Sequence, residues 1–267
     1  MTAPTASDPA EPVVRRSDAG AVATLTLARP AARNALSFEV LDVLADHLAA
    51  IGADPAVHVV VLAGDGPAFS AGHDLREIVA HPDEADRRLL FARCSDVMLA
   101  ITGLRQPVIA KVHGVATAAG CQLVATCDLA VAGTSARFAT PGVDIGLFCT
   151  TPMVALTRNV SSKAAMEMLL TGELIDAEHA LRIGLVNRVV PDADLDAEVD
   201  GLADLVASKP PATVALGKAA FHRLRSLPLD QAYADASETM ACNLEMDEAA
   251  EGIAAFLEKR PPRWSSS

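Results

Sequence analysis

Segments rich in β-branched residues alternate with segments of helical periodicity along most of this chain, and after that the strands stop. The alternating part predicts strands at 13–27 (as a pair turning at Asp18-Ala19-Gly20), 58–63, 107–113 and 129–132, and helices at 38–51, 83–101 and 118–126. Strands and helices in this order are typical of a sheet joined by repeated helical crossovers. We therefore expect an α/β fold.

The last part of the sequence has a different character. From residue 195 onward the pattern predicts only helices, at 195–208, 212–224 and 229–257. We expect residues 13–195 to form the core and residues 196–267 to form a helical C-terminal region that acts as a cap or an oligomerisation element. Residues 1–12 are rich in Pro, Ala and acidic side chains, and we expect them to be disordered.

The charge balance limits the class of partner. The 267 residues carry a formal net charge of −12, and a nucleic-acid partner would require an excess of Lys and Arg to neutralise phosphates. We therefore expect no nucleic-acid partner, although a few local cations could still hold a small anionic ligand. Aromatic residues make up only 3% of the chain, so the core must be built mainly from Ala, Val, Leu and Ile.

Cysteine usage and the N-terminal sequence bear on the compartment. The five cysteines are an odd number and form no C-x-x-C pair, which favours free buried thiols in a reducing environment. The N-terminal segment has no apolar stretch typical of a secretory signal, and no uncharged stretch is long enough for a membrane span. We expect a cytoplasmic protein without a membrane partner.

Several common site signatures are incomplete or missing. Gly64-x-Gly66 follows a predicted strand, but no third glycine completes a dinucleotide-binding fingerprint. The chain has neither a P-loop lysine nor a G-x-S-x-G elbow, and its histidines and cysteines lack metal-ligand spacing. We therefore expect no metal and no separate cofactor, and we set nucleotide enzymes and hydrolases aside.

Two runs of small residues lead into predicted helix starts. One is Ala71-Gly72-His73, followed by Asp74 as a helix cap, and the other is Ala118-Ala119-Gly120. The first N–H groups of a helix have no intrahelical acceptor, so two converging helix starts could together bind an oxyanion. Two tight turns packed against neighbouring residues would produce the same pattern, and the spacing alone does not separate these interpretations.

Longer motifs add a family resemblance. The segments are RPAARNALS at 29–37, AFSAGHDLREI at 68–78, VHGVATAAGCQLVATCDLAVA at 112–132, FATP at 138–141 and FLEKRP at 256–261. In this order they resemble the enoyl-CoA hydratase/isomerase (crotonase) superfamily, and GLFCTTP at 146–152 is similar to one branch of it. The resemblance implies a spiral of ββα units, a C-terminal helical trimerisation region, a homotrimer or dimer of trimers, and an acyl-CoA thioester ligand whose coenzyme A is part of the substrate.

The resemblance also assigns ligand-binding residues. The thioester oxygen would lie between the backbone N–H groups of His73 and Ala119, which explains why bulky side chains are excluded there. Ala71 belongs to the first of these loops, and Arg76 matches a basic position beside it that is close to the CoA adenine. Arg33 and Lys259 are candidates for the CoA phosphates, with ordinary surface cations as the alternative.

The chain departs from the hydratases at both acid–base positions. The glutamate that activates water is replaced by Gln122, and the glutamate that handles the α-carbon proton is replaced by Gly142. Glutamine can orient a water but cannot take up its proton, and glycine has no side chain. Asp144 is the nearest carboxylate and would face the same side as residue 142 in an extended segment, with a solvated loop aspartate as the alternative. For Cys149 we favour a packed thiol over a nucleophile.

Two functions therefore stay open. The first is an enzyme of the hydratase/isomerase type with a weak or atypical acid–base set. The second is a non-catalytic acyl-CoA-binding or regulatory protein that has kept the site and lost the chemistry.

Overall fold

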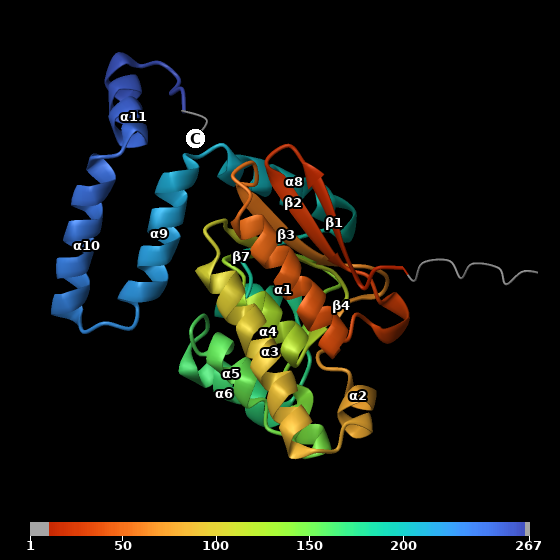
Figure 1. Ribbon diagram of the computed structural model, residues 1–267. Helices are drawn as coiled ribbons and strands as arrows, with labels where there is room; N and C mark the ends of the chain where they lie inside the picture. Colours follow the sequence, from red (N-terminus) through yellow and green to blue (C-terminus); the bar gives the residue numbers. More distant parts are fainter. Residues whose placement is uncertain (1–10, 265–267) are drawn as a thin grey trace, which may run out of the picture.

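A computed structural model describes residues 11–264, and a six-stranded sheet forms its centre (Figure 1). The strands are β1 (Val14–Ala19), β2 (Val22–Leu27), β3 (Val59–Gly64), β5 (Val108–Val112), β7 (Leu129–Gly133) and β10 (Arg188–Val190). They lie in the order β1-β2-β3-β5-β7-β10, and only β1 and β2 pair antiparallel. The predicted hairpin and the α/β class are confirmed. Most of the segment expected to be disordered lies outside the described residues.

A second sheet has four strands, three of which follow a strand of the first sheet along the chain. Its members are β4 (Ala68–Ser70), β6 (Val115–Thr117), β8 (Arg137–Ala139) and β9 (Ile175–Asp176), in the order β4-β6-β8-β9. Because β4, β6 and β8 come directly after β3, β5 and β7, each strand pair leads into a helix, as expected for a spiral of ββα units. The parallel pairing of β4 with β6 also brings the chain segments that follow these strands close together.

Helices cover both faces of the six-stranded sheet. Alternate residues of β3 point to opposite faces: Val60 and Leu62 join the large core cluster, whereas Val59 and Val61 join a second cluster. The large cluster includes buried residues of α1 (Phe38–Gly52), α3 (Glu84–Gly103) and α4 (Ala119–Thr126). The second cluster is completed by α8 (Leu195–Ala207). The predicted boundary at residue 195 stays a prediction, and α8 beyond it packs on the sheet.

The local signals at two helix starts act as predicted. Ser37 caps α1, since its Oγ accepts the Val40 N–H at 3.2 Å. Asp74 caps α2 (Leu75–Ala80), since its Oδ1 accepts the Arg76 N–H at 3.2 Å. Between β8 and β10 lie α5 (Thr150–Leu156), α6 (Ser162–Thr171) and α7 (Ala177–Ile183), and the short 3-10 helix η2 (Pro141–Ile145) precedes them.

The C-terminal helices α9 (Pro211–Leu224), α10 (Leu229–Leu244) and α11 (Asp247–Glu258) stand away from the sheet (Figure 1). The prediction of a single helix over 229–257 is wrong, because the helix breaks at Glu245-Met246 and a new helix, α11, begins at Asp247. The break is stabilised by Glu248, whose buried carboxylate accepts the Thr213 N–H at 3.2 Å and so ties α11 to the start of α9. Within the described residues, no helix has the length and apolar character needed to cross a membrane.

Candidate functional site

The two predicted helix starts are in direct contact. A Cβ built on Gly120 would lie 2.2 Å from the carbonyl oxygen of Ser70, so α4 packs against β4 with no room for a side chain. Gly72 has φ +88°, and a Cβ there would lie 2.9 Å from the Thr117 oxygen and 3.1 Å from the Ala119 nitrogen. The small residues are therefore required by close packing of one loop on the other. This contact also brings the two loops to a common point.

Each loop leaves one N–H group free at that point. The Leu36 N–H donates to the Gly72 oxygen at 2.8 Å and the Asp74 N–H donates to the Leu36 oxygen at 3.2 Å, while the N–H of His73 between them has no acceptor among the described residues. The N–H of Ala119, the first residue of α4, likewise has none within residues 11–264.

The backbone at Ala118 is strained in a way that orients α4. Its φ of 50° and ψ of −118° are unusual for a residue with a side chain, and its N–H is held by the Ala139 oxygen at 2.9 Å. Strain of this kind persists only where the surrounding structure imposes it, and it is concentrated at functional sites. Here it turns the chain so that α4 begins with Ala119 directly beside Gly72.

The side chain of His73 lies away from this point. Its ring packs edge-on against Phe91 with ring centroids 5.3 Å apart, and neither ring nitrogen has a hydrogen-bond partner in the described chain. Burial lowers the pKa of the imidazole, which favours the neutral form. The expected role of the His73 backbone N–H stays a prediction.

Two of the expected CoA-binding cations lie near the first loop. The Ala71 N–H donates to the Arg33 oxygen at 3.0 Å, which fixes residue 33 beside the loop. The side chains of Arg33 and Arg76 are exposed, and neither has a carboxylate partner among the described residues.

Lys259 is not brought to the same place within one chain. It caps α11, and Figure 1 shows α11 and α2 at opposite ends of the molecule. Within one chain Lys259 therefore lies far from Arg33 and Arg76, and its assignment to the CoA phosphates stays a prediction. The separation arises because the C-terminal helices turn away from the sheet after α8.

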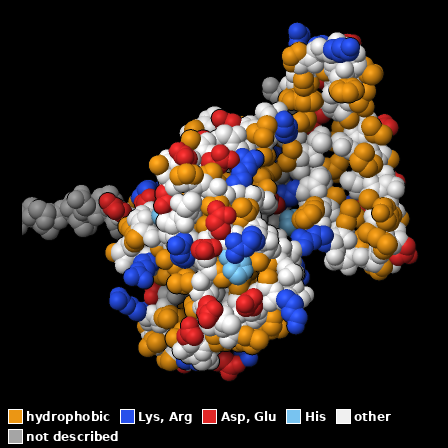
Figure 2. Space-filling view, turned by 180° about the vertical axis from the view of Figure 1, so that it is seen from behind, with side chains coloured by type: hydrophobic (Ala, Val, Ile, Leu, Met, Phe, Trp, Pro, Cys, Tyr) orange, Lys and Arg blue, Asp and Glu red, His pale blue; other side chains and the backbone are white. Residues whose placement is uncertain are grey.

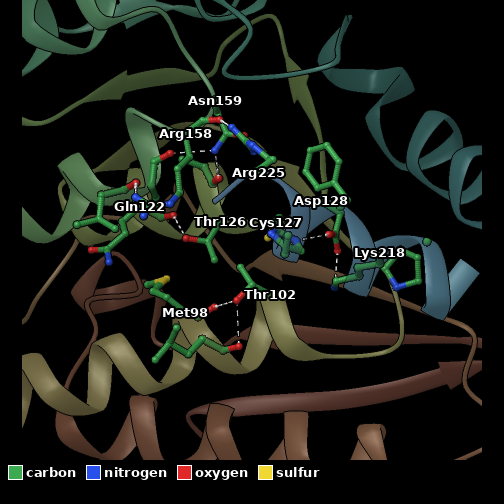
Figure 3. A pocket seen from close by; sticks show the side chains of 18 of the residues that line it. Met98, Thr102, Gln122, Thr126, Cys127, Asp128, Arg158, Asn159, Lys218 and Arg225 are labelled. Carbon is green, nitrogen blue, oxygen red and sulfur yellow. Dashed lines mark hydrogen bonds and ion pairs between the residues drawn. The ribbon is translucent and has the colours of Figure 1, made fainter. Parts of the chain in front are cut away.

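Gln122 borders a cavity of about 590 Å³ between α3, α4, α5 and α9 (Figure 3). Its side chain is buried on α4, and its Oε1 atom has no hydrogen-bond partner among the described residues. The same helix therefore presents a free N–H at Ala119 and an unpaired amide oxygen about one turn later.

The surroundings of Gly142 leave no space for a carboxylate. A Cβ built there would lie 2.5 Å from the Leu147 oxygen and 2.8 Å from the Sγ atom of Cys149, because the loop after η2 folds back through the Leu147 N–H to Gly142 oxygen bond of 2.8 Å. Burial raises the pKa of the Cys149 thiol, which agrees with a packed thiol rather than an activated nucleophile.

Asp144 lies apart from the cavity of Gln122. Its segment is a 3-10 helix and not the extended stretch that would turn residues 142 and 144 to the same side. The Asp144 side chain is exposed at Gly172, where a built Cβ would lie 3.1 Å from its Oδ2, and Asp144 does not line the cavity of Gln122.

Sequence reasoning missed the buried charges at the other side of the cavity. Lys218 of α9 donates to Asp128 Oδ2 at 2.6 Å, and it also donates to the oxygens of Ile101 at 2.8 Å and Gln106 at 3.0 Å. His222 Nε2 lies 3.6 Å from the other oxygen of Asp128. Residues 128 and 218 are far apart in sequence, so no local pattern could have indicated this pair. No group of residues suited to hold a metal ion occurs within the described chain.

Comparisons with known proteins agree with this architecture. The rat enoyl-CoA hydratase domain-containing protein 3, mitochondrial, is 45% identical over 244 residues, covering 91% of this chain and 81% of the relative. The crystal structure of enoyl-CoA hydratase from Mycobacterium smegmatis has a TM-score of 0.93 at 54% identity, covering 95% of this chain and 99% of that chain. The crystal structure of human enoyl coenzyme A hydratase domain-containing protein 3 has a TM-score of 0.92 at 43% identity, covering 94% of this chain and 100% of that chain.

The family description "Enoyl-CoA hydratase/isomerase" matches residues 17–267, which is nearly the whole chain. The match includes both small-residue loops, the segment around Gly142 and the C-terminal helices. The chain therefore belongs to the enoyl-CoA hydratase/isomerase family and has its crotonase fold.

Proposed function

We propose that this protein binds acyl-CoA thioesters and stabilises the thioester enolate between the N–H groups of His73 and Ala119. The observation that carries the proposal is that these two N–H groups lack acceptors although their loops are packed against each other. Isothermal calorimetry with acetyl-CoA and a long-chain acyl-CoA tests it. Absence of both heat and a thermal shift at millimolar ligand would remove the proposal.

The expected catalytic contribution of such a site is electrostatic. Negative charge builds on the thioester oxygen when the α-carbon is deprotonated or when water attacks the β-carbon of an enoyl thioester. Pre-oriented N–H groups stabilise this charge without reorganisation. Loss of one such donor typically costs on the order of 10²–10³-fold in rate. Arg76 would lie near the CoA adenine and Arg33 near its phosphates; both are exposed cations beside the first loop.

We expect the wild-type protein to hydrate crotonyl-CoA poorly. Gln122 cannot accept a proton from water, and general acid–base groups typically contribute about 10²–10⁴-fold each. Gln122→Glu should raise the rate, with hydration followed by absorbance. The gain should be partial, because water activation and α-carbon protonation act as a unit.

The structure argues against restoring the second glutamate by a substitution at position 142. A glutamate at position 142 would place its Cβ against the Leu147 carbonyl, so Gly142→Glu should lower stability rather than restore a second carboxylate. The carboxyl group of Gln122→Glu would be buried, which raises its pKa and makes a rate that increases with pH the expected signature. Wild-type turnover equal to that of ordinary hydratases would show that another group carries the proton.

A non-catalytic acyl-CoA-binding protein is the alternative function. The observation that favours it is the closed loop over Gly142, which fills the place of one catalytic carboxylate with Leu147 and Cys149. The two functions differ in a steady-state assay against a panel of enoyl-CoA and dienoyl-CoA thioesters. Binding by calorimetry without turnover of any of them would identify the alternative.

We further propose that the protein is a homotrimer or a dimer of trimers. Figure 2 shows hydrophobic side chains gathered over the protruding C-terminal helices, where Tyr233 is 70%, Phe256 81% and Leu257 73% exposed. A patch of this kind on a water-soluble chain normally marks an interface. Light scattering should give a trimer or hexamer mass, and a 27.7 kDa particle alone would contradict the proposal. The cytoplasmic location stays a prediction.

A further inference from the structure

The charge of the cavity beside Gln122 is opposite to that of the whole chain. Its described lining includes three cationic side chains, Arg158, Lys218 and Arg225, and a single carboxylate, Asp128. Lys218 neutralises Asp128 through a contact of 2.6 Å, so the remaining excess charge comes from the two arginines. This occurs in a protein with a net charge of −12, where a cationic cavity wall is not expected from composition.

The two arginines are held together and lack carboxylate partners among the described residues. Arg225 donates to the backbone oxygen of Arg158, and its guanidinium carbon lies 5.1 Å from the centre of the Phe221 ring. Arg158, in the turn after α5, donates to the Val154 oxygen of that helix at 2.7 Å. By contrast, the nearby Arg223 on α9 is paired with Asp235.

The position of this pair along α4 relates it to the proposed thioester site. Asn159, next to Arg158, donates to the Ala125 oxygen at 2.6 Å, so the pair lies near the C-terminal end of α4. Gln122 is three residues, or roughly 4.5 Å along the axis, closer to the start of that helix. Figure 3 shows Gln122 and the arginines from different elements around the same cavity. An acyl chain that begins at Ala119 and passes Gln122 would therefore reach the arginines with its far end.

We propose that the preferred ligands of this site are CoA thioesters of dicarboxylic acids, in which the distal carboxylate pairs with Arg158 and Arg225. This inference rests on the proposed function, because it assumes that the thioester lies at Ala119. Apolar side chains of Met98, Leu99 and Val214 line the cavity and suit the methylene chain. Arginine is well suited to the terminal group because its planar guanidinium can bind a carboxylate through two hydrogen bonds.

Calorimetry with the mono-CoA thioester of octanedioic acid, octanoyl-CoA and free CoA tests the proposal. The wild type should bind the dicarboxylic thioester about tenfold more tightly than octanoyl-CoA, as expected for a partly solvated charge-assisted pair. The preference should weaken with added salt. Arg158→Gln with Arg225→Gln should abolish the preference and leave octanoyl-CoA binding unchanged.

Controls separate charge from folding. Arg158→Gln alone removes one hydrogen bond to the Val154 oxygen of α5 and should reduce the preference by several-fold without a change in thermal melt. Arg87→Gln removes an equally exposed arginine of α3 that does not line the cavity, and it should leave the preference intact. Equal affinities for the two thioesters, or a preference that survives the double substitution, would overturn this inference alone. Failure of all three ligands to bind would overturn the proposed function together with it.

Discussion

Replacing Ala119 with proline is expected to reduce turnover of a CoA thioester by on the order of 10²–10³-fold, because the substitution deletes one of the two proposed oxyanion donors. Ala119 is the first residue of α4, and its N–H has no acceptor among the described residues, so no native hydrogen bond is lost. Proline is well tolerated at the first position of a helix, but the preceding Ala118 is not extended (φ 50°, ψ −118°), so Ala119→Pro should also lower the melting temperature. The measurement is steady-state turnover of the best thioester found, together with a thermal melt.

The control must separate loss of the N–H from the backbone effect of proline. Ser162 is the exposed first residue of α6, and the preceding Ser161 is extended at φ −62° and ψ 152°, as a residue before proline requires. Ser162→Pro should therefore leave both the thermal melt and turnover unchanged. A folded Ala119→Pro protein with wild-type turnover would show that this N–H does not stabilise the reaction.

Lys218→Met is expected to lower the free energy of unfolding by about 3 kcal/mol, because it leaves the carboxylate of Asp128 buried without its cation. The side chain of Lys218 is 6% exposed and that of Asp128 is 18% exposed, so water can replace the lost cation only in part. The effect should be concentrated at α9, because Ala220 is the only buried residue of that helix in the described structure. Denaturant unfolding measures the change.

Two further variants identify the physical cause. Asp128→Asn should recover part of the stability of Lys218→Met, since it removes the unpaired charge, and the double-mutant cycle measures the coupling. Lys111→Met is the matched surface control: its 2.7 Å ion pair is with Asp196, which is 80% exposed, so its loss should cost less than about 1 kcal/mol. Equal effects at positions 218 and 111 would show that burial does not strengthen the first pair.

The close contact between the two loops could be predicted only in part from the sequence. Small residues before two helix starts indicated that something approaches the backbone at Gly72 and Gly120. The partner of each glycine is the other loop, through Thr117 and Ser70, and this depends on the pairing of β4 with β6. Each of these strands has only three residues, too few to show a reliable period of their own.

At positions 122 and 142 the sequence shows which residues are present, and only the structure shows what surrounds them. The absence of two glutamates was evident from Gln122 and Gly142, since residue identity needs no structure. That the space beside Gly142 is filled, and that Asp144 turns to Gly172, follows from the 3-10 helix and the returning loop. The direction in which the Asp144 carboxylate points could therefore not be predicted from its position in the sequence.

The sequence by itself determined the α/β class, the hairpin at the start, the caps at Ser37 and Asp74, and the family. All of these depend on local periodicity, side-chain chemistry at single positions, or motifs of contiguous residues. Only the tertiary structure decided that Lys218 neutralises Asp128 and that the C-terminal helix is interrupted at Glu245-Met246. It also decided that Arg225 donates to the backbone of Arg158 in the cavity that Gln122 lines. These features depend on contacts between residues distant in sequence, whose energies exist only after the sheets and helices have packed.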